Sequence, residues 1–256
     1  MKELKSLKKY SFKIIRIMKK LFVALMCIGC LASCTLFDAM KYSEEIYDGA
    51  DPSYDKYPGM NANTDPLTGT AFYWPEAFKI NSVIMGEQNQ RDEEDQSEDL
   101  VISKNMYGSG LCVIVTLDIT NVTSSKQTLV LPRGLLIEAA SSAYQNGILV
   151  KDVKIPFKAN EQRKVSVRFY CLNSSAHASD GEAVYGIGYV TNIAAFQPLF
   201  NVCEGKKLNI DQYSTLSILS YYSACTVVQE IVWAITQGKT FTEKEIKKYL
   251  KHVKRG

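Results

Sequence analysis

The sequence predicts a mainly β protein, an antiparallel Ig-like β-sandwich followed by a C-terminal helical segment. Apolar and polar residues alternate between Leu111 and Val190, and turn residues separate the alternating runs. After Phe200 the hydrophobic period becomes helical. The chain has 256 residues, of which 46% are hydrophobic, so it can bury a core of useful size and is not disordered as a whole.

Residues 1–33 are expected to form a lipoprotein signal peptide. Basic residues crowd the start, and the mainly apolar run from Leu21 to Cys30 is too short to span a bilayer. The next four residues, Leu31-Ala32-Ser33-Cys34, resemble the lipobox of bacterial lipoproteins, in which the Cys receives diacylglycerol and becomes the mature N-terminus. An N-terminal membrane helix, or a cleaved signal with a chance Cys, is the alternative. Met18 is a second candidate for the true start.

The lipobox resemblance implies a membrane anchor at Cys34, where each buried acyl methylene adds about 0.8 kcal/mol of membrane affinity. Thr35 follows the Cys, in place of the Asp that resembles an inner-membrane retention signal in enteric bacteria. We therefore expect an exported protein on the outer membrane, with its orientation open. The whole chain has a net charge of +3, but the residues after 33 hold 22 basic and 26 acidic side chains, a net charge of −4. Nucleic acid is thus not a predicted partner.

Residues 34–75 are predicted to be a flexible tether, because they are rich in Asp, Tyr, Pro, Gly and Asn and show little periodicity. Residues 77–85 are the first expected strand of a sandwich that covers residues 76–200. The following run from Glu87 to Asp99 contains seven acidic residues and one Arg, but it lacks the internal Gly turn of a calcium loop. We interpret this run as a solvated loop.

The strands of the sandwich are predicted from residues that share one face at a spacing of two. The clearest run begins at Leu111, and later runs end near Cys171 and Val190. Gln145-Asn146-Gly147 has the sequence of a hairpin turn. The residues expected to face the core are Leu111, Val113, Val115, Leu117, Ile119, Leu129, Leu131, Val153, Ile155, Phe157, Val165, Val167, Phe169 and Cys171.

Residues 201–256 are predicted to be helical and to pack on the sandwich. Residues 209–212 resemble a capping start for a helix through Leu219, which continues as an apolar stripe and stops at Gly238. Thr242 and Glu245 have the spacing of a capping box at the start of a last helix.

Two short motifs are the strongest candidates for chemistry. Phe169-Tyr170-Cys171-Leu172-Asn173 ends a predicted strand, and Val227-Val228-Gln229-Glu230-Ile231-Val232-Trp233 lies on a predicted helix. The pair resembles the thioester domains of bacterial surface adhesins, in which an aromatic-Cys-hydrophobic motif on a strand precedes an apolar-Gln motif on a helix, often ending in Trp. Residues 131–134 and 171–173 also look like a broader group of uncharacterised exported bacterial sandwich proteins.

The thioester-domain resemblance implies that Cys171 attacks the side-chain amide of Gln229 and expels ammonia. The resulting thioester is an activated acyl group that reacts when an amine arrives. Phe169, Tyr170 and Trp233 are of the right type to form the apolar walls of the site. This interpretation predicts a covalent link to a surface protein, and a glycan is a further candidate partner.

The cysteines support a competing interpretation. Cys112, Cys171, Cys203 and Cys225 remain after Cys34, and an even number in an exported chain indicates two disulfides with three possible connectivities. Cys171 would then pair with Cys203 or Cys225, Gln229 would bond only to backbone, and Trp233 would be core. A thioester would instead leave an odd thiol among the other three.

Other chemistry has little support. His177 and His252 are the only histidines, so a multi-His zinc site or a Ser-His-Asp triad is not expected, and neither a cofactor nor a metal is predicted. We therefore predict a lipid-anchored binding and adhesion module without turnover. The alternatives are a disulfide-stapled structural or assembly subunit of an envelope complex, in which residues 77–85 form a strand shared with a partner, and a glycan hydrolase with paired carboxylates.

Overall fold

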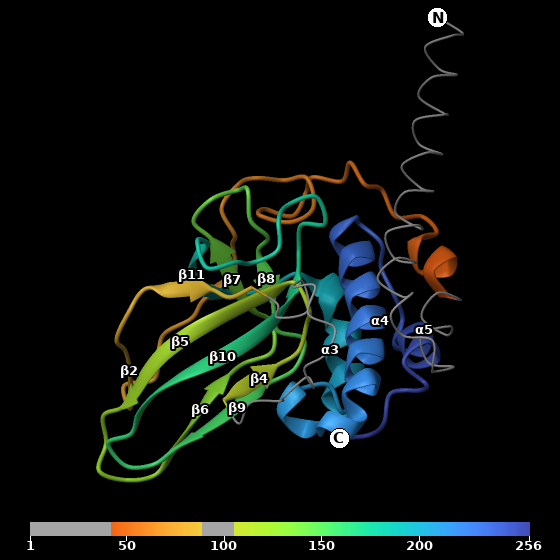
Figure 1. Ribbon diagram of the computed structural model, residues 1–256. Helices are drawn as coiled ribbons and strands as arrows, with labels where there is room; N and C mark the ends of the chain where they lie inside the picture. The colour runs from red at the N-terminus through yellow and green to blue at the C-terminus, as the bar shows by residue number, and fades with distance from the viewer. Residues whose placement is uncertain (1–41, 89–104) are drawn as a thin grey trace, which may run out of the picture. The chain divides into compact units, whose positions relative to one another are not determined.

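The computed structural model describes residues 42–88 and 105–256, which contain a β-barrel and a group of helices beside it (Figure 1). The strands are β1 (Thr70–Ala71), β2 (Phe78–Ile80), β3 (Ile84–Gly86), β4 (Met106–Gly108), β5 (Val113–Asn121), β6 (Gln127–Leu131), β7 (Leu135–Ala139), β8 (Gly147–Ile148), β9 (Val153–Phe157), β10 (Gln162–Cys171) and β11 (Val184–Val190). The helices that follow them are α3 (Gln197–Glu204), α4 (Ile218–Thr236) and α5 (Glu243–Tyr249).

Six strands close into an antiparallel barrel in the order β5-β3-β11-β7-β8-β10, and β10 pairs again with β5. The closure depends on the length of β10. Its residues Gln162–Phe169 pair with β5 along one edge, whereas Tyr170 and Cys171 pair with β8 on the other. Short strands extend the barrel: β2 pairs with β5, β1 with β11, and β4 runs parallel to β10.

The expected Ig-like sandwich is therefore wrong, although the protein is mainly β as predicted. Alternation of apolar residues reports which face of each strand is buried, but it does not report which strands pair. The pairings that close the barrel join β3 to β5 and to β11, segments far apart in the sequence. A closed barrel also removes the open sheet edges that a sandwich would leave.

The core fills the barrel and continues under the two-stranded sheet of β6 and β9. Every residue expected from the alternation to face the core belongs to this buried cluster, except Leu111, which is half-buried. The expected strand over 77–85 is divided into β2 and β3, and both pair within this chain. Of the predicted acidic loop, Glu87 accepts hydrogen bonds from the Ser166 hydroxyl at 2.8 and 2.7 Å, and residues 89–99 lie outside the described residues.

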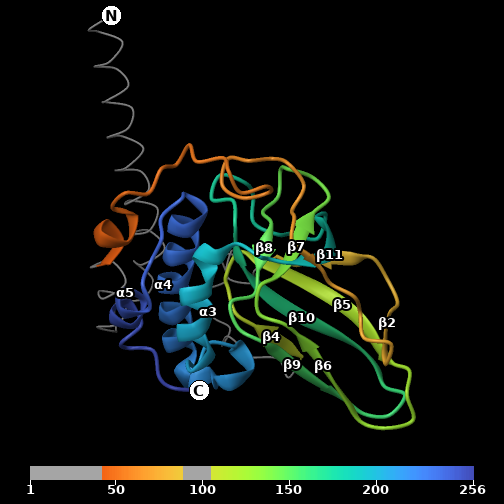
Figure 2. The ribbon, with the colours of Figure 1, turned by 180° about the vertical axis from the view of Figure 1, so that it is seen from behind.

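Helix α4 lies along the barrel, with α3 beside it (Figure 2). The segment 215–236 is long and apolar enough to cross a membrane, but two thirds of its apolar 18-residue stretch is buried inside the protein, as in a core helix. The predicted stop at Gly238 is confirmed, since α4 ends at Thr236 and Gly238 has φ of 84°. The capping box of Thr242 and Glu245 is also present.

The start of this helix differs from the prediction. The capping box of Asn209 and Gln212 closes only a single 3-10 turn, and α4 begins later, at Ile218. Leu216, expected on the helix, is fully exposed. Capping residues stabilise the first turn of a helix but do not decide how far it continues.

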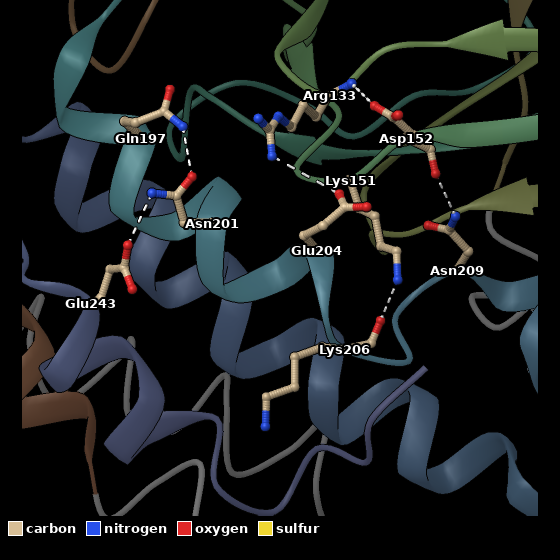
Figure 3. Close-up of polar contacts among 9 residues, drawn as sticks. All are labelled: Arg133, Lys151, Asp152, Gln197, Asn201, Glu204, Lys206, Asn209 and Glu243. Carbon is tan, nitrogen blue, oxygen red and sulfur yellow. Dashed lines mark hydrogen bonds and ion pairs between the residues drawn. The ribbon is translucent and has the colours of Figure 1, made fainter.

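Polar contacts join α3 and the segment after it to the barrel (Figure 3). The Asn209 side chain donates to the Asp152 carbonyl at 2.9 Å, and the Lys151 ammonium donates to the Lys206 carbonyl at 2.7 Å. Helix α3 is also joined to α5, because Asn201 Nδ2 donates to Glu243 Oε1 at 2.9 Å. Side-chain to main-chain bonds of this kind fix the helices on the barrel at defined points.

Residues 42–75, expected to belong to a flexible tether, instead pack on the barrel and helices. Residues 42–47 are helical, and Ile46, Met60 and Leu67 are at most 2% exposed. We call residues 42–67 the strap. Burial of these apolar side chains provides the driving force for packing. The prediction missed them because the segment as a whole is rich in polar and turn residues.

Candidate functional site

Cys171 is the last residue of β10, beyond the point where β5 stops pairing with that strand. The pairing of β5 and β10 ends at Val113 and Phe169, so the β5 ladder does not reach the main-chain groups of Cys171. Cys171 is fully buried and belongs to the barrel core. On this edge of β10, the N–H and C=O of Cys171 can therefore bond to a group that is not part of β5.

The side-chain carboxamide of Gln229, on α4, bonds to both of these main-chain groups. The Cys171 N–H donates to Gln229 Oε1 at 2.9 Å, and Gln229 Nε2 donates to the Cys171 carbonyl at 2.8 Å. Trp233, one helical turn further along the same face, donates from Nε1 to Cys171 Sγ at 3.4 Å. Both predicted motifs therefore meet: Gln229 bonds to the main chain of Cys171, as the competing interpretation also expected, and Trp233 contacts the thiol.

The environment of Cys171 keeps its thiol protonated. Burial raises the pKa of this thiol far above its ordinary value, and Cys112 raises it further. The hydrogen bonds from Trp233 and from the Asn173 backbone act in the opposite direction, but they do not offset the burial. The site thus holds a neutral thiol shielded from water, which protects it from oxidation and alkylation.

The expected walls are divided between two faces of β10. Phe169 shares the face of Cys171 and is fully buried in the same core. Tyr170 lies on the opposite face, because successive side chains alternate across a strand, and its hydroxyl donates to Cys225 Sγ at 3.7 Å. Phe169 and Trp233 therefore surround Cys171, whereas Tyr170 packs against α4.

The strap is fastened to the residues that directly follow Cys171. The Asn61 N–H donates to the Leu172 carbonyl at 2.9 Å, and Asn173 Nδ2 donates to the Gly59 carbonyl at 3.0 Å. Asn146 Nδ2 donates to the same Gly59 carbonyl at 2.9 Å. Gly59 and Asn61 both have positive φ, 69° and 51°, which suits Gly and is tolerated by Asn.

A second strap contact lies beside Gln229. The hydroxyl of Tyr47 forms a hydrogen bond with the side chain of Glu230, the residue after Gln229. Burial, followed by the Glu230 charge, raises the pKa of Tyr47 well above its ordinary value, so the hydroxyl stays protonated and acts as the donor. No sequence signal marked Tyr47, because it lies in a stretch without hydrophobic periodicity.

The cysteines do not form the expected disulfides. Cys112, Cys171, Cys203 and Cys225 all lie in the described part of the chain, and no disulfide joins any of them there. Cys203 is buried on α3, Cys225 is buried on α4, and Cys112 is half-buried. The lipidation candidate Cys34 lies outside the described residues. In residues 42–88 and 105–256 no three His, Cys, Asp or Glu side chains are grouped to hold a metal ion.

Comparisons with protein-family models, curated proteins and solved structures gave no match to this chain. Its function is therefore inferred from the geometry around Cys171 and Gln229.

Proposed function

We propose that this protein is a lipid-anchored binding and adhesion module of the bacterial envelope that attaches to an amine through an internal Cys171–Gln229 thioester. The observation that supports it is the seating of the Gln229 carboxamide on the main chain of Cys171 by two hydrogen bonds, at 2.9 and 2.8 Å, with both residues buried. The signal peptide and Cys34 anchor, the outer membrane and a surface-protein or glycan partner are parts of the same proposal.

The arrangement supplies one element that thioester formation needs, a hydrogen-bond donor for the carboxamide oxygen. Cys171 Sγ attacks Gln229 Cδ, a C–S bond forms, the C–N bond breaks, and the thiol proton leaves with the amide nitrogen as ammonia. The Cys171 N–H already donates to Gln229 Oε1, the atom on which negative charge develops in the tetrahedral intermediate. Phe169 and Trp233 keep water from the product, since both pack against the same core.

A structural role in an envelope complex is the second candidate. The two hydrogen bonds of Gln229 also complete the β10 ladder where β5 ends, which stabilises the barrel without any chemistry. The form of this candidate in which residues 77–85 add to a partner has no support, because β2 and β3 are paired with β5.

Amine incorporation tests the proposal. The full chain, purified in detergent, is incubated with a fluorescent primary amine, and the labelled peptide is identified by mass spectrometry. We expect stable label on Gln229 in the wild type and none in Cys171→Ala. Cys203→Ala removes an equally buried thiol on a different helix from Gln229, so it serves as the matched control and should label normally. Equal labelling of the wild type and Cys171→Ala, or none in either, would refute the thioester.

A further inference from the structure

A basic surface covers the exposed side of α5 and of the residues after it. The apolar side chains of this segment, Ile246 and Leu250 among them, are buried, and the cations between them are exposed. We call these exposed cations the basic face: Lys244, Lys247, Lys248, Lys251, Lys254 and Arg255. Residues 243–256 contain only two acidic side chains, Glu243 and Glu245. The basic face therefore carries more positive charge than its own segment neutralises.

Ion pairs within the protein hold only part of this charge. The Lys247 ammonium lies 2.8 Å from the Glu243 carboxylate, and the Lys248 ammonium lies 2.6 Å from the carboxylate of Glu45 in the strap. All four of these side chains are at least 42% exposed, and exposed pairs of this kind are weak, so water or other anions can replace either partner. Among residues 42–88 and 105–256, no carboxylate lies within 4.0 Å of the charged group of Lys254. The basic face is thus open to an external anionic surface.

The first described residue of the strap lies against the same surface. The ring centroid of Tyr42 is 5.2 Å from that of Tyr249, and the Lys251 ammonium is 5.8 Å from the centroid of the Tyr42 ring. Both views show the helical turn of the strap beside α5 (Figures 1 and 2). Seven residues separate Cys34 from Tyr42 in the sequence. The chain can therefore hold these two residues no more than about 28 Å apart, so a lipid on Cys34 would keep the basic face near the membrane surface.

We infer that the basic face docks on the anionic phospholipid headgroups of the leaflet that holds the Cys34 anchor. This inference rests on the lipid anchor of the proposed function and does not depend on the thioester. The six cations complement the phosphate groups of a lipid such as phosphatidylglycerol, because basic residues next to a membrane anchor are attracted to an anionic leaflet. Docking would fix the orientation of the body. The turn that joins β5 to β6, which both views show far from α5, would then point away from the membrane.

The reactivity of individual lysines on vesicles tests the docking. The full chain, purified in detergent from bacterial membranes, is reconstituted into vesicles of phosphatidylcholine alone or with about 30% phosphatidylglycerol. Acetylation of each lysine by a reagent that does not cross membranes is then followed by mass spectrometry. We expect Lys251 and Lys254 to react about fivefold more slowly on the anionic vesicles, and to recover in about 0.5 M NaCl, which screens the attraction. Lys126 is exposed in the turn between β5 and β6, so it is the internal control and should react equally on both vesicles.

Charge reversal separates docking from anchoring. Lys251→Glu combined with Lys254→Glu reverses two exposed cations of the basic face, so the acetylation of Lys244 should no longer depend on phosphatidylglycerol. Lys126→Glu combined with Lys158→Glu makes the same change of charge at the far end of the barrel, where the Lys158 carbonyl accepts from the Asn121 side chain that ends β5. This matched control should keep the protection of the wild type.

Two failures are distinguishable. Equal reactivity of Lys251 and Lys254 on both kinds of vesicle, or protection that charge reversal leaves intact, would overturn the inference. A chain that does not float with either kind of vesicle would refute the lipid anchor of the proposed function instead. Flotation is measured before any lysine is labelled, so the second failure is recognised first.

Discussion

Met60→Ala tests whether the strap is part of the folded body. Met60 is 1% exposed, so the substitution removes the thioether and methyl of a completely buried side chain. The lost transfer free energy and the cavity left behind together predict a loss of about 3 kcal/mol in the free energy of unfolding. A flexible tether at this position would give no measurable change.

Urea unfolding followed by tryptophan fluorescence measures this loss. With a denaturant dependence of about 2–3 kcal/mol per M for a body of this size, the midpoint should fall by about 1 M. Leu216→Ala is the control, because Leu216 is 100% exposed, and its effect should remain within about 0.5 kcal/mol. If Met60→Ala and Leu216→Ala have the same midpoint as wild type, the packing of the strap is wrong.

Two further predictions concern stability. Gly238→Ala should lower the free energy of unfolding by about 2 kcal/mol, because φ is 84° there and the new Cβ would lie 2.6 Å from the ring of Tyr54. Gly205→Ala is the control: φ is −83° and the space is open, so the free energy of unfolding should change by no more than about 0.5 kcal/mol. Burial raises the pKa of Cys203 to about 12 from an ordinary value of 9.0, so its contribution to stability is complete below pH 9.0 and is lost as the pH rises toward 12. Urea midpoints should therefore fall from about pH 8 to about 10, and less steeply in Cys203→Ala; equal slopes in the two proteins would contradict this.

Much of the local structure could be predicted from the sequence, because it depends on neighbouring residues. The alternation from Val113 to Ile119 indicated the buried face of β5, and the Thr242 and Glu245 pair indicated the start of α5. Barrel closure could not be predicted, since it depends on which distant strands meet. The pairing of β10 with β5 and with β8 at different points along its length leaves no mark in the local pattern.

The candidate site was predicted in part. The resemblance selected Cys171, Gln229 and Trp233, and the structure joins the Gln229 carboxamide to the Cys171 main chain and the Trp233 ring to the Cys171 thiol. It did not reveal the strap, because Asn61 bonds to the distant Leu172 carbonyl, a contact that requires no hydrophobic periodicity. Tyr47 was missed because it lies in a stretch without hydrophobic periodicity.

The intact mass of the full chain, purified without reductant in detergent, tests the central claim most directly. We predict a mass lower than that of the same preparation treated with methylamine by one methylamine, and lower by one ammonia than the reduced chain with an intact Gln229. Cys171→Ala should show neither difference. A deficit of four hydrogens that reductant restores would mean two disulfides, and together with no response to methylamine it would contradict the Cys171–Gln229 thioester.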